Sequence, residues 1–323
     1  MGKIILQSLK TVSGKKSSGY LNICGTNSLL PATVICGEDE GKTVLITGGI
    51  HNAEYVGIQT AIDIAKEISP QDLRGNLIIV PLTNRSGFEN RTMSLVYEDG
   101  KNLNRQFPGN IEGTLAEKIS LFIENELFTL ADYYIDLHCG DGFEALTPFV
   151  YCQGKATKEV CRSSLSMAKA VNVPYIVKSQ LDSGGAYNYA GACGIPGILM
   201  ERGGVGLWSW DEVDKYKADV KNVLRTIGVL AGEPKICADP KIFTQTIYDF
   251  SSSIGCWYPK YEVGDVILKG SVLGEVRDYF GNIISTCFAK KNGIVLFQTV
   301  SLNVLKNDPL IAYGVCDGEG EDI

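Results

Sequence analysis

Histidine is scarce in this chain, with only His51 and His138 among 323 residues. Each directly follows a strand-like apolar run, and Glu54 stands three residues after the first. Imidazole is the commonest protein ligand for zinc, and a His-x-x-Glu pair with a distant histidine is the ligand set of a catalytic zinc site that keeps one position open. We therefore expect His51, Glu54 and His138 to bind one Zn²⁺ per chain. Two ordinary histidines remain the alternative at this point, because His-x-x-Glu recurs by chance.

The ten cysteines include no Cys-x-x-Cys pair, which excludes a zinc ribbon and a dithiol redox motif. Long apolar runs are also missing, so we expect neither a signal peptide nor contact with a membrane. The cysteines are then expected to be reduced thiols of a cytoplasmic protein. Cys139, beside His138, is expected to be a small buried residue rather than a nucleophile.

An excess of basic charge is lacking as well, because 30 Lys and Arg stand against 37 Asp and Glu, a net charge of −7. Phosphate binding needs a clustered basic surface, so we expect no nucleic-acid partner. Apolar residues make up 45% and charged residues 21% of the chain, which is typical of a folded protein with a substantial core.

Strand-like runs alternate with helical patterns through the first 230 residues. Short β segments, which could form a hairpin, are expected over 1–35, and a long loop over 87–109. The expected strands are 43–47, 77–82, 133–137, 149–152, 175–177 and 198–200, and the expected helices are 53–68, 114–127, 157–171, 185–193 and 211–230. Thr114 and Glu117 have the spacing of a capping box. The alternation predicts an α/β fold, with a mixed, mostly parallel sheet and helices on both faces.

The pattern changes after Pro234 to short β runs separated by Gly and Asp turns. This predicts a C-terminal all-β module. We place the boundary within 232–240, so that 1–235 is one domain and 236–323 the other. The acidic end, 317–323, is expected to fray.

Ligands of such sheets bind beyond the carboxyl ends of the strands, where His51, His138 and Glu201 are all expected to lie. Zinc lowers the pKa of a bound water to about 7; amide hydrolysis also needs a base, positive charge and a substrate anchor. Glu201 is the predicted base, with a salt bridge to a neighbouring arginine as the alternative. Arg91, Asn104 and Arg105, in the long loop, could bind carboxylate or an oxyanion.

Four ordered motifs resemble the succinylglutamate desuccinylase/aspartoacylase family, which is similar to the zinc carboxypeptidases: Gly48–Glu54, Asp99–Gly109, Asp136–His138 and Glu201–Gly204. The resemblance spans about 40–315. It implies that His51, Glu54 and His138 bind zinc and that Glu201 activates the zinc-bound water. It also implies that Arg91 polarises the scissile carbonyl, whereas Asn104 and Arg105 bind the substrate carboxylate. Arg85 is a weaker candidate for the same role of binding carboxylate or stabilising the oxyanion.

The C-terminal segments Val263–Gly274 and Asn292–Phe297 resemble a lipoyl- or biotinyl-type barrel-sandwich hybrid. No carrier lysine stands in a matching hairpin, so covalent cofactor attachment is not expected. We expect this module to enclose one side of the site, which would restrict it to small substrates, or to support a homo-oligomer.

The predicted function is zinc-dependent deacylation of an N-acyl amino acid. A carboxypeptidase acting on short peptides is the close alternative, because it would use the same zinc and base. An inactive binding or scaffold protein is the alternative of another class. Tyr187 and Tyr189 are candidates, by position, for a tyrosine over the substrate; packing is their other interpretation.

Overall fold

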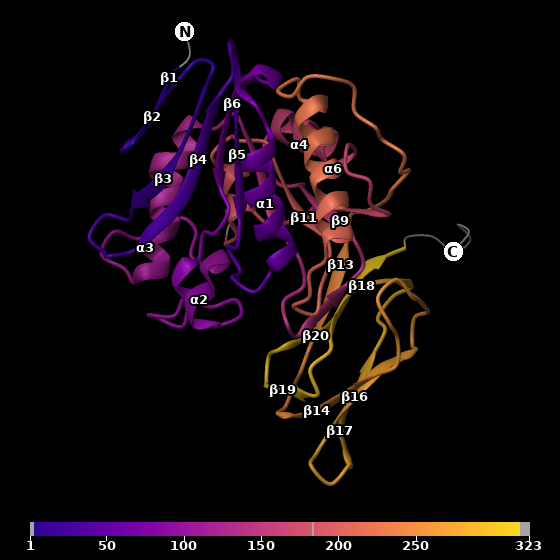
Figure 1. Cartoon of the computed structure of the whole chain (residues 1–323). Helices are drawn as coiled ribbons and strands as arrows, with labels where there is room; N and C mark the ends of the chain where they lie inside the picture. The colour runs from indigo at the N-terminus through magenta and orange to yellow at the C-terminus, as the bar shows by residue number, and fades with distance from the viewer. Residues whose placement is uncertain (1–2, 183, 317–323) are drawn as a thin grey trace.

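The computed structural model describes residues 3–182 and 184–316. Its centre is a nine-stranded sheet of order β12-β10-β9-β11-β7-β5-β6-β4-β3 (Figure 1). The strands are β3 (Lys15–Asn22), β4 (Leu29–Cys36), β5 (Asp39–Gly48), β6 (Arg74–Val80), β7 (Tyr133–His138), β9 (Phe149–Gln153), β10 (Tyr175–Ser179), β11 (Gly197–Glu201) and β12 (Lys241–Phe243). A separate hairpin, β1 (Lys3–Leu6) and β2 (Leu9–Val12), precedes them.

The sheet is mixed and mostly parallel, as predicted. β5 pairs in parallel with β6 and β7, β7 with β11, and β10 with β9 and β12. β3, β4 and β6 pair antiparallel, so the expected N-terminal hairpin leads into the sheet. β9 also runs antiparallel to β11. Because parallel neighbours end at one edge, the carboxyl ends of β5, β7 and β11 lie side by side.

Helices cover both faces of the sheet, as predicted. One face packs against α1 (Tyr55–Glu67), α4 (Lys158–Ala168) and α6 (Trp210–Thr226), and the other against α3 (Leu115–Phe122) and α5 (Ala186–Ala192). Side chains alternate between faces along a strand. In β7, Ile135 and Leu137 therefore join the α1–α6 core, whereas Tyr134 joins the α3–α5 core. His138 shares the second side with Tyr134.

Three local expectations differ from the structure. The loop predicted over 87–109 is wrong at its start, because residues 87–90 belong to the helix α2 (Arg85–Asn90). This helix is capped by the side chain of Asn84, which accepts a bond from Gly87 N. α4 and α6 end earlier than expected, the latter just before Gly228, whose φ is 74°. The capping box of Thr114 and Glu117 is confirmed. Short turns complete this part: η1 (Pro70–Asp72), η2 (Leu103–Arg105), η3 (Ile123–Leu127) and η4 (Phe128–Leu130).

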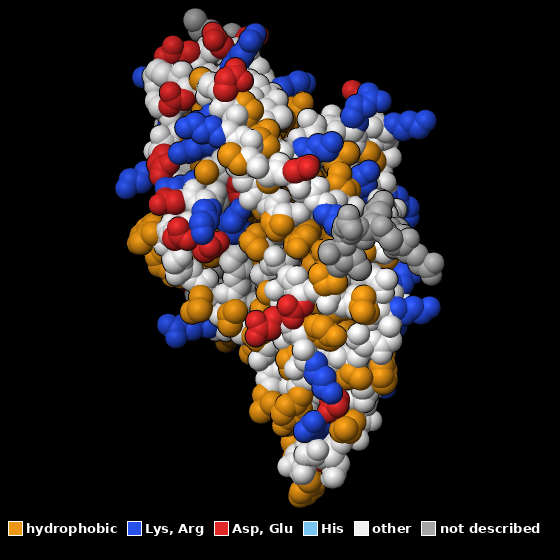
Figure 2. Space-filling view, turned by 90° about the vertical axis from the view of Figure 1, so that its right-hand side faces the viewer, with side chains coloured by type: hydrophobic (Ala, Val, Ile, Leu, Met, Phe, Trp, Pro, Cys, Tyr) orange, Lys and Arg blue, Asp and Glu red, His pale blue; other side chains and the backbone are white. Residues whose placement is uncertain are grey.

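The C-terminal part forms two antiparallel sheets, which confirms the predicted all-β character. One sheet has the order β13-β20-β18-β15, with β8 also on β18, and the other has the order β17-β16-β14-β19. The strands are β8 (Glu144–Leu146), β13 (Thr246–Phe250), β14 (Gly255–Pro259), β15 (Val266–Ile267), β16 (Val272–Arg277), β17 (Ile283–Phe288), β18 (Gly293–Thr299), β19 (Asn303–Val304) and β20 (Pro309–Val315). The β16–β17 turn contains no lysine; its Phe280 is 90% exposed, and hydrophobic side chains mark this end of the molecule in Figure 2.

The two parts exchange strands. β12 follows the predicted boundary yet extends the central sheet, with Tyr175 opposite Lys241. β8 precedes the boundary yet joins the C-terminal sheet, with Leu146 opposite Phe297. A division at residue 235 stays a prediction. The acidic end, 317–323, lies outside the described residues. Within 3–182 and 184–316, no helix is long and apolar enough to cross a membrane.

Candidate metal and catalytic site

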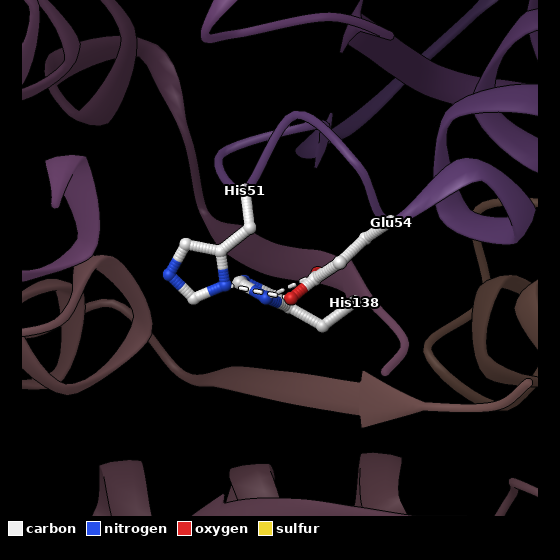
Figure 3. Close-up of side chains that lie close together, drawn as sticks. All are labelled: His51, Glu54 and His138. Carbon is white, nitrogen blue, oxygen red and sulfur yellow. Dashed lines mark hydrogen bonds and ion pairs between the residues drawn. The ribbon is translucent and has the colours of Figure 1, made fainter. Parts of the chain in front are cut away.

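His51, Glu54 and His138 meet at the carboxyl ends of β5 and β7. His51 lies in the turn after β5, Glu54 immediately precedes α1, and His138 is the last residue of β7. One ligand atom from each lies within 4.8 Å of the other two. Figure 3 shows the carboxylate of Glu54 directed toward both imidazoles. The sequence therefore predicted the three residues that the fold brings together.

Glu54 contacts both histidines at hydrogen-bond distance. Its Oε1 lies 2.7 Å from His51 Nδ1, and its Oε2 lies 2.8 Å from His138 Nδ1. The backbone N–H of Cys139 donates a third bond to Oε2, at 3.2 Å. The two rings meet edge to face, with centroids 4.9 Å apart. Both Nδ1 atoms consequently face one point beside the carboxylate.

The residues around the imidazoles fit a zinc site. His138 Nε2 lies 3.1 Å from Asp136 Oδ2, and Thr47 Oγ1 donates to the other oxygen of Asp136 at 2.7 Å. His51 Nε2 lies 3.2 Å from Asn102 Oδ1. Ligating histidines almost always donate the N–H of their second nitrogen to a carboxylate, a carbonyl or water, which fixes the ring and the tautomer. Asp136 stands where it can accept from His138, although the 3.1 Å contact does not have the geometry of a hydrogen bond. No role was predicted for Asp136 or Asn102 from the sequence, although Asp136 lies two residues before His138 on the same face of β7.

Electrostatics favour a cation at this point. Burial acts to lower the pKa of His138, but the charges of Glu54 and Asp136 outweigh it and raise the pKa well above the usual value. Burial acts to raise the pKa of Glu54, and the two imidazoles outweigh it to lower that pKa to about 2. The three side chains thus hold positive charge next to a fixed carboxylate. A divalent ion would supply that charge in place of the imidazole proton.

Glu201 ends β11 directly beside the three candidate metal ligands. It stands opposite His138 in the parallel β7–β11 register and opposite Phe149 of β9. Its Oε2 is buried and has no hydrogen-bond partner among residues 3–182 and 184–316. Burial, followed by the charge of Glu54, raises the pKa of Glu201 well above its usual value. The alternative, a salt bridge between Glu201 and the neighbouring arginine, is wrong, because Arg202 pairs with Asp219 at 2.7 Å.

The predicted substrate residues lie on the segment between α2 and α3. Asn104 is buried, and its Oδ1 accepts a bond from Ala186 N at the start of α5, at 2.8 Å. Arg105 is exposed and donates to the carbonyl of Asn104. Arg91 is exposed and ends α2 with a φ of 57°. Arg85 is engaged by Glu89 at 2.8 Å. Binding roles for Arg91, Asn104 and Arg105 stay predictions.

A tyrosine for which the sequence predicted no role comes close to Glu201, the predicted base. Tyr248, on β13 of the C-terminal part, lies with its hydroxyl 2.7 Å from that of Tyr151. Burial raises its pKa, the charges of Glu201 and Glu144 raise it further, and Arg105 lowers it. Tyr187 instead packs against Tyr151, and the Tyr189 hydroxyl donates to Glu124 at 2.7 Å. No local pattern marks Tyr248, because its contact with Tyr151 joins segments that are 97 residues apart in the sequence.

Two further acidic residues, Asp141 and Glu144, follow β7 shortly after His138. Burial, together with the charge of Asp141, raises the pKa of Glu144 to about 8. Asp141 bonds to the backbone N–H of Phe143, at 2.9 Å. Among residues 3–182 and 184–316, no lysine or arginine forms an ion pair with either carboxyl. This part of the site is therefore suited to a positively charged group.

Comparison with known families shows to which family the chain belongs. The model of the succinylglutamate desuccinylase/aspartoacylase catalytic domain matches residues 40–227. The chain belongs to this family. Its relatives cleave amide bonds, and the predicted resemblance is thereby confirmed.

Individual relatives give the same result over longer stretches. An N-alpha-acetyl-L-2,4-diaminobutyric acid deacetylase of Halomonas elongata is 30% identical over 77% of this chain and 74% of its own length. The product-bound ectoine utilization protein EutE (DoeB) of Ruegeria pomeroyi is 28% identical, with a TM-score of 0.85, over 93% of this chain and 95% of that one. A succinylglutamate desuccinylase of Silicibacter sp. TM1040 is 26% identical, with a TM-score of 0.79, over 97% and 98%.

Proposed function

We propose that this protein is a zinc-dependent hydrolase that removes the acyl group from an N-acyl amino acid. The observation that carries the proposal is the convergence of His51, Glu54 and His138 beside the buried, unpartnered oxygen of Glu201. A scaffold protein would need none of these four residues so arranged. Zinc, when bound, would act as a Lewis acid on the amide carbonyl and lower the pKa of a water molecule.

The chain's own residues supply the proton transfers. The carboxylate of Glu201 takes a proton from the attacking water, whose oxygen forms the new bond to the acyl carbon. The same carboxyl then delivers that proton to the amide nitrogen as the C–N bond breaks, releasing a carboxylic acid and a free amine. A group that does both needs a pKa nearer neutrality than an ordinary glutamate has, which is the direction that burial gives Glu201.

Positive charge and substrate orientation are assigned to the α2–α3 segment. We propose that Arg91 contacts the carbonyl oxygen as negative charge develops on it, a contribution of about 3–4 kcal/mol where such a donor is well placed. Arg105 and Asn104 take the substrate carboxylate, since a guanidinium pairs with carboxylate through two hydrogen bonds. Tyr248 covers the substrate from the C-terminal part.

The acidic pair Asp141 and Glu144 supports an amino acid with a cationic side chain as the substrate. The Halomonas elongata relative deacetylates N-alpha-acetyl-2,4-diaminobutyric acid, by its name, and that compound carries both a carboxylate and an ammonium group. We therefore propose N-acetyl-L-2,4-diaminobutyrate as the first substrate to assay. Short peptides test the carboxypeptidase alternative.

The test combines metal analysis with the Glu201→Gln variant. Wild-type protein purified without chelator is expected to contain about one zinc per chain, as a three-ligand site predicts. Glu201→Gln should keep the zinc and lose about 10²–10⁴-fold in kcat, whereas the exposed Glu126→Gln serves as the control and keeps both. Near-normal turnover by Glu201→Gln would remove this residue from the mechanism. Faster cleavage of peptides than of N-acyl amino acids would favour the peptidase.

A further inference from the structure

Tyr216, a residue of α6, lies beneath the site with its hydroxyl between two strand ends. The side chain is fully buried. Its hydroxyl oxygen lies 3.1 Å from His138 N, 2.9 Å from His138 O and 2.5 Å from Met200 O. A hydroxyl has one proton and two acceptor lone pairs. It therefore accepts from the amide of His138 and shares its proton between the two carbonyls.

These contacts join the strand of a metal ligand to the strand of the base. Glu201 opposite His138 is the last pair of the β7–β11 ladder, and Met200 directly precedes Glu201. Beyond this pair the two segments are joined by backbone bonds from Arg202 N to His138 O at 3.4 Å and from Gly140 N to Gly203 O at 3.0 Å. The Tyr216 hydroxyl adds a side-chain bridge between the two strand ends, through their backbone atoms.

A second contact from α6 holds the residue after the base. Asp219, three residues along the helix, accepts a bond from Arg202 Nη2 at 2.7 Å, and the same nitrogen donates to Asn172 O at 3.0 Å. Arg202 and Asp219 are both buried. α6 is tied to α1 as well, because Lys217 and Lys221 each lie 2.7 Å from Glu67. α6 therefore contacts α1, which starts next to Glu54, as well as the ends of β7 and β11.

We propose that Tyr216, supported by the Asp219–Arg202 pair, is a positioning residue that sets the spacing between the metal ligands and Glu201. The inference rests on the proposed function, since it assumes that His138 binds a metal and that Glu201 is the base. Loss of the hydroxyl leaves the amide of His138 and the carbonyl of Met200 without their buried partner. One of the contacts that hold the ends of β7 and β11 at a fixed spacing is then lost.

The test compares Tyr216→Phe with Tyr313→Phe. Tyr313 is equally buried and its hydroxyl accepts a bond from Lys290 N at 2.9 Å, but it lies in the C-terminal sheet. Both variants lose one buried hydroxyl, so a merely structural effect should lower both melting temperatures alike. Zinc release into excess chelator is the deciding measurement. We expect release about fivefold or more faster from Tyr216→Phe, with Tyr313→Phe unchanged.

A smaller difference in zinc release between the two variants overturns the inference. In the steady state, Tyr216→Phe should lose about tenfold in kcat with little change in KM, because only the transition-state geometry is disturbed. Should Tyr216→Phe fail to fold, Asp219→Asn is measured against Tyr313→Phe by the same criterion. Wild-type protein that binds zinc yet hydrolyses no amide would contradict the proposed function. The rates of zinc release from Tyr216→Phe and Tyr313→Phe would still test the positioning role of Tyr216.

Discussion

Glu54 is the residue on which the site depends, because each of its two oxygens contacts a different histidine. All three metal-binding candidates could be predicted, since a His-x-x-Glu pair and a strand-end histidine are visible in the sequence. Asp136 and Tyr216 could not be assigned. Their roles depend on which side of β7 a residue faces and on which helix lies beneath it, and both are decided by packing.

The metal-free protein is predicted to lose stability as the pH rises. The pKa of His138 is raised in the folded state, so its contribution is complete below the unfolded value of about 6.5 and is lost as the pH passes through the raised value. The raised pKa of Glu201 acts in the same direction. Urea unfolding of the metal-free protein should give a lower free energy of unfolding at pH 9 than at pH 6, by about 1–3 kcal/mol.

Zinc-loaded protein is the control for this prediction. Zinc binds imidazole only in its neutral form, so the stabilisation that zinc adds should grow as the pH rises. A metal-free His138→Gln variant should show a weaker pH dependence than the metal-free wild type. Equal stability of the metal-free wild type at both pH values would contradict the assigned electrostatics.

The segment between α2 and α3 is held at the site by contacts with the start of α3. Asp99 accepts bonds from Lys101 N and from Ala116 N, at 2.9 and 2.8 Å. Lys101 pairs with Glu117 at 2.7 Å, and the next residue, Asn102, contacts His51. The capping box could be predicted because it is local. The preceding α2 could not, since it has six residues and its cap, Asn84, is fixed by Asn52 from another turn.

Asp99→Ala is predicted to loosen this segment while the rest of the fold persists. The backbone N–H of Ala116 would lose its partner at the start of α3, and Arg105 and Asn104 would lose their fixed position. We expect KM to rise about three- to tenfold with a smaller change in kcat, as for loss of a binding contact. Limited proteolysis should cut the variant within 91–110 sooner than the wild type. The exposed Glu112→Ala is the control, and equal KM values in the two variants would contradict the prediction.

For the whole molecule, the alternation of strands and helices was sufficient to predict a mostly parallel sheet and an all-β C-terminal part. It could not predict that β9 runs antiparallel to β11. It also could not predict that β8 joins the C-terminal sheet and β12 the central sheet. These features depend on pairing between segments that are distant in the sequence. Tyr248 was missed for the same reason. The sequence shows where strands lie, and tertiary packing decides which neighbour each one takes.

A chain ending at residue 235 is predicted not to fold into a stable active domain. The truncation removes β12 and leaves the edge of β10 open, and β8 loses β18 as its partner. Exposed strand edges favour aggregation. We expect the fragment to be insoluble or to lack the cooperative thermal transition of the full chain. Co-expression with residues 236–323 should restore solubility, and a soluble, active 1–235 fragment would show that the shared strands are dispensable.

The edge-to-face contact of His51 and His138 has a practical consequence. Since the chain has no third histidine, every imidazole proton resonance in an NMR spectrum belongs to this pair. The natural protein thus carries its own reporter, and occupancy, protonation and exchange of the ion can be followed without a label or an engineered probe.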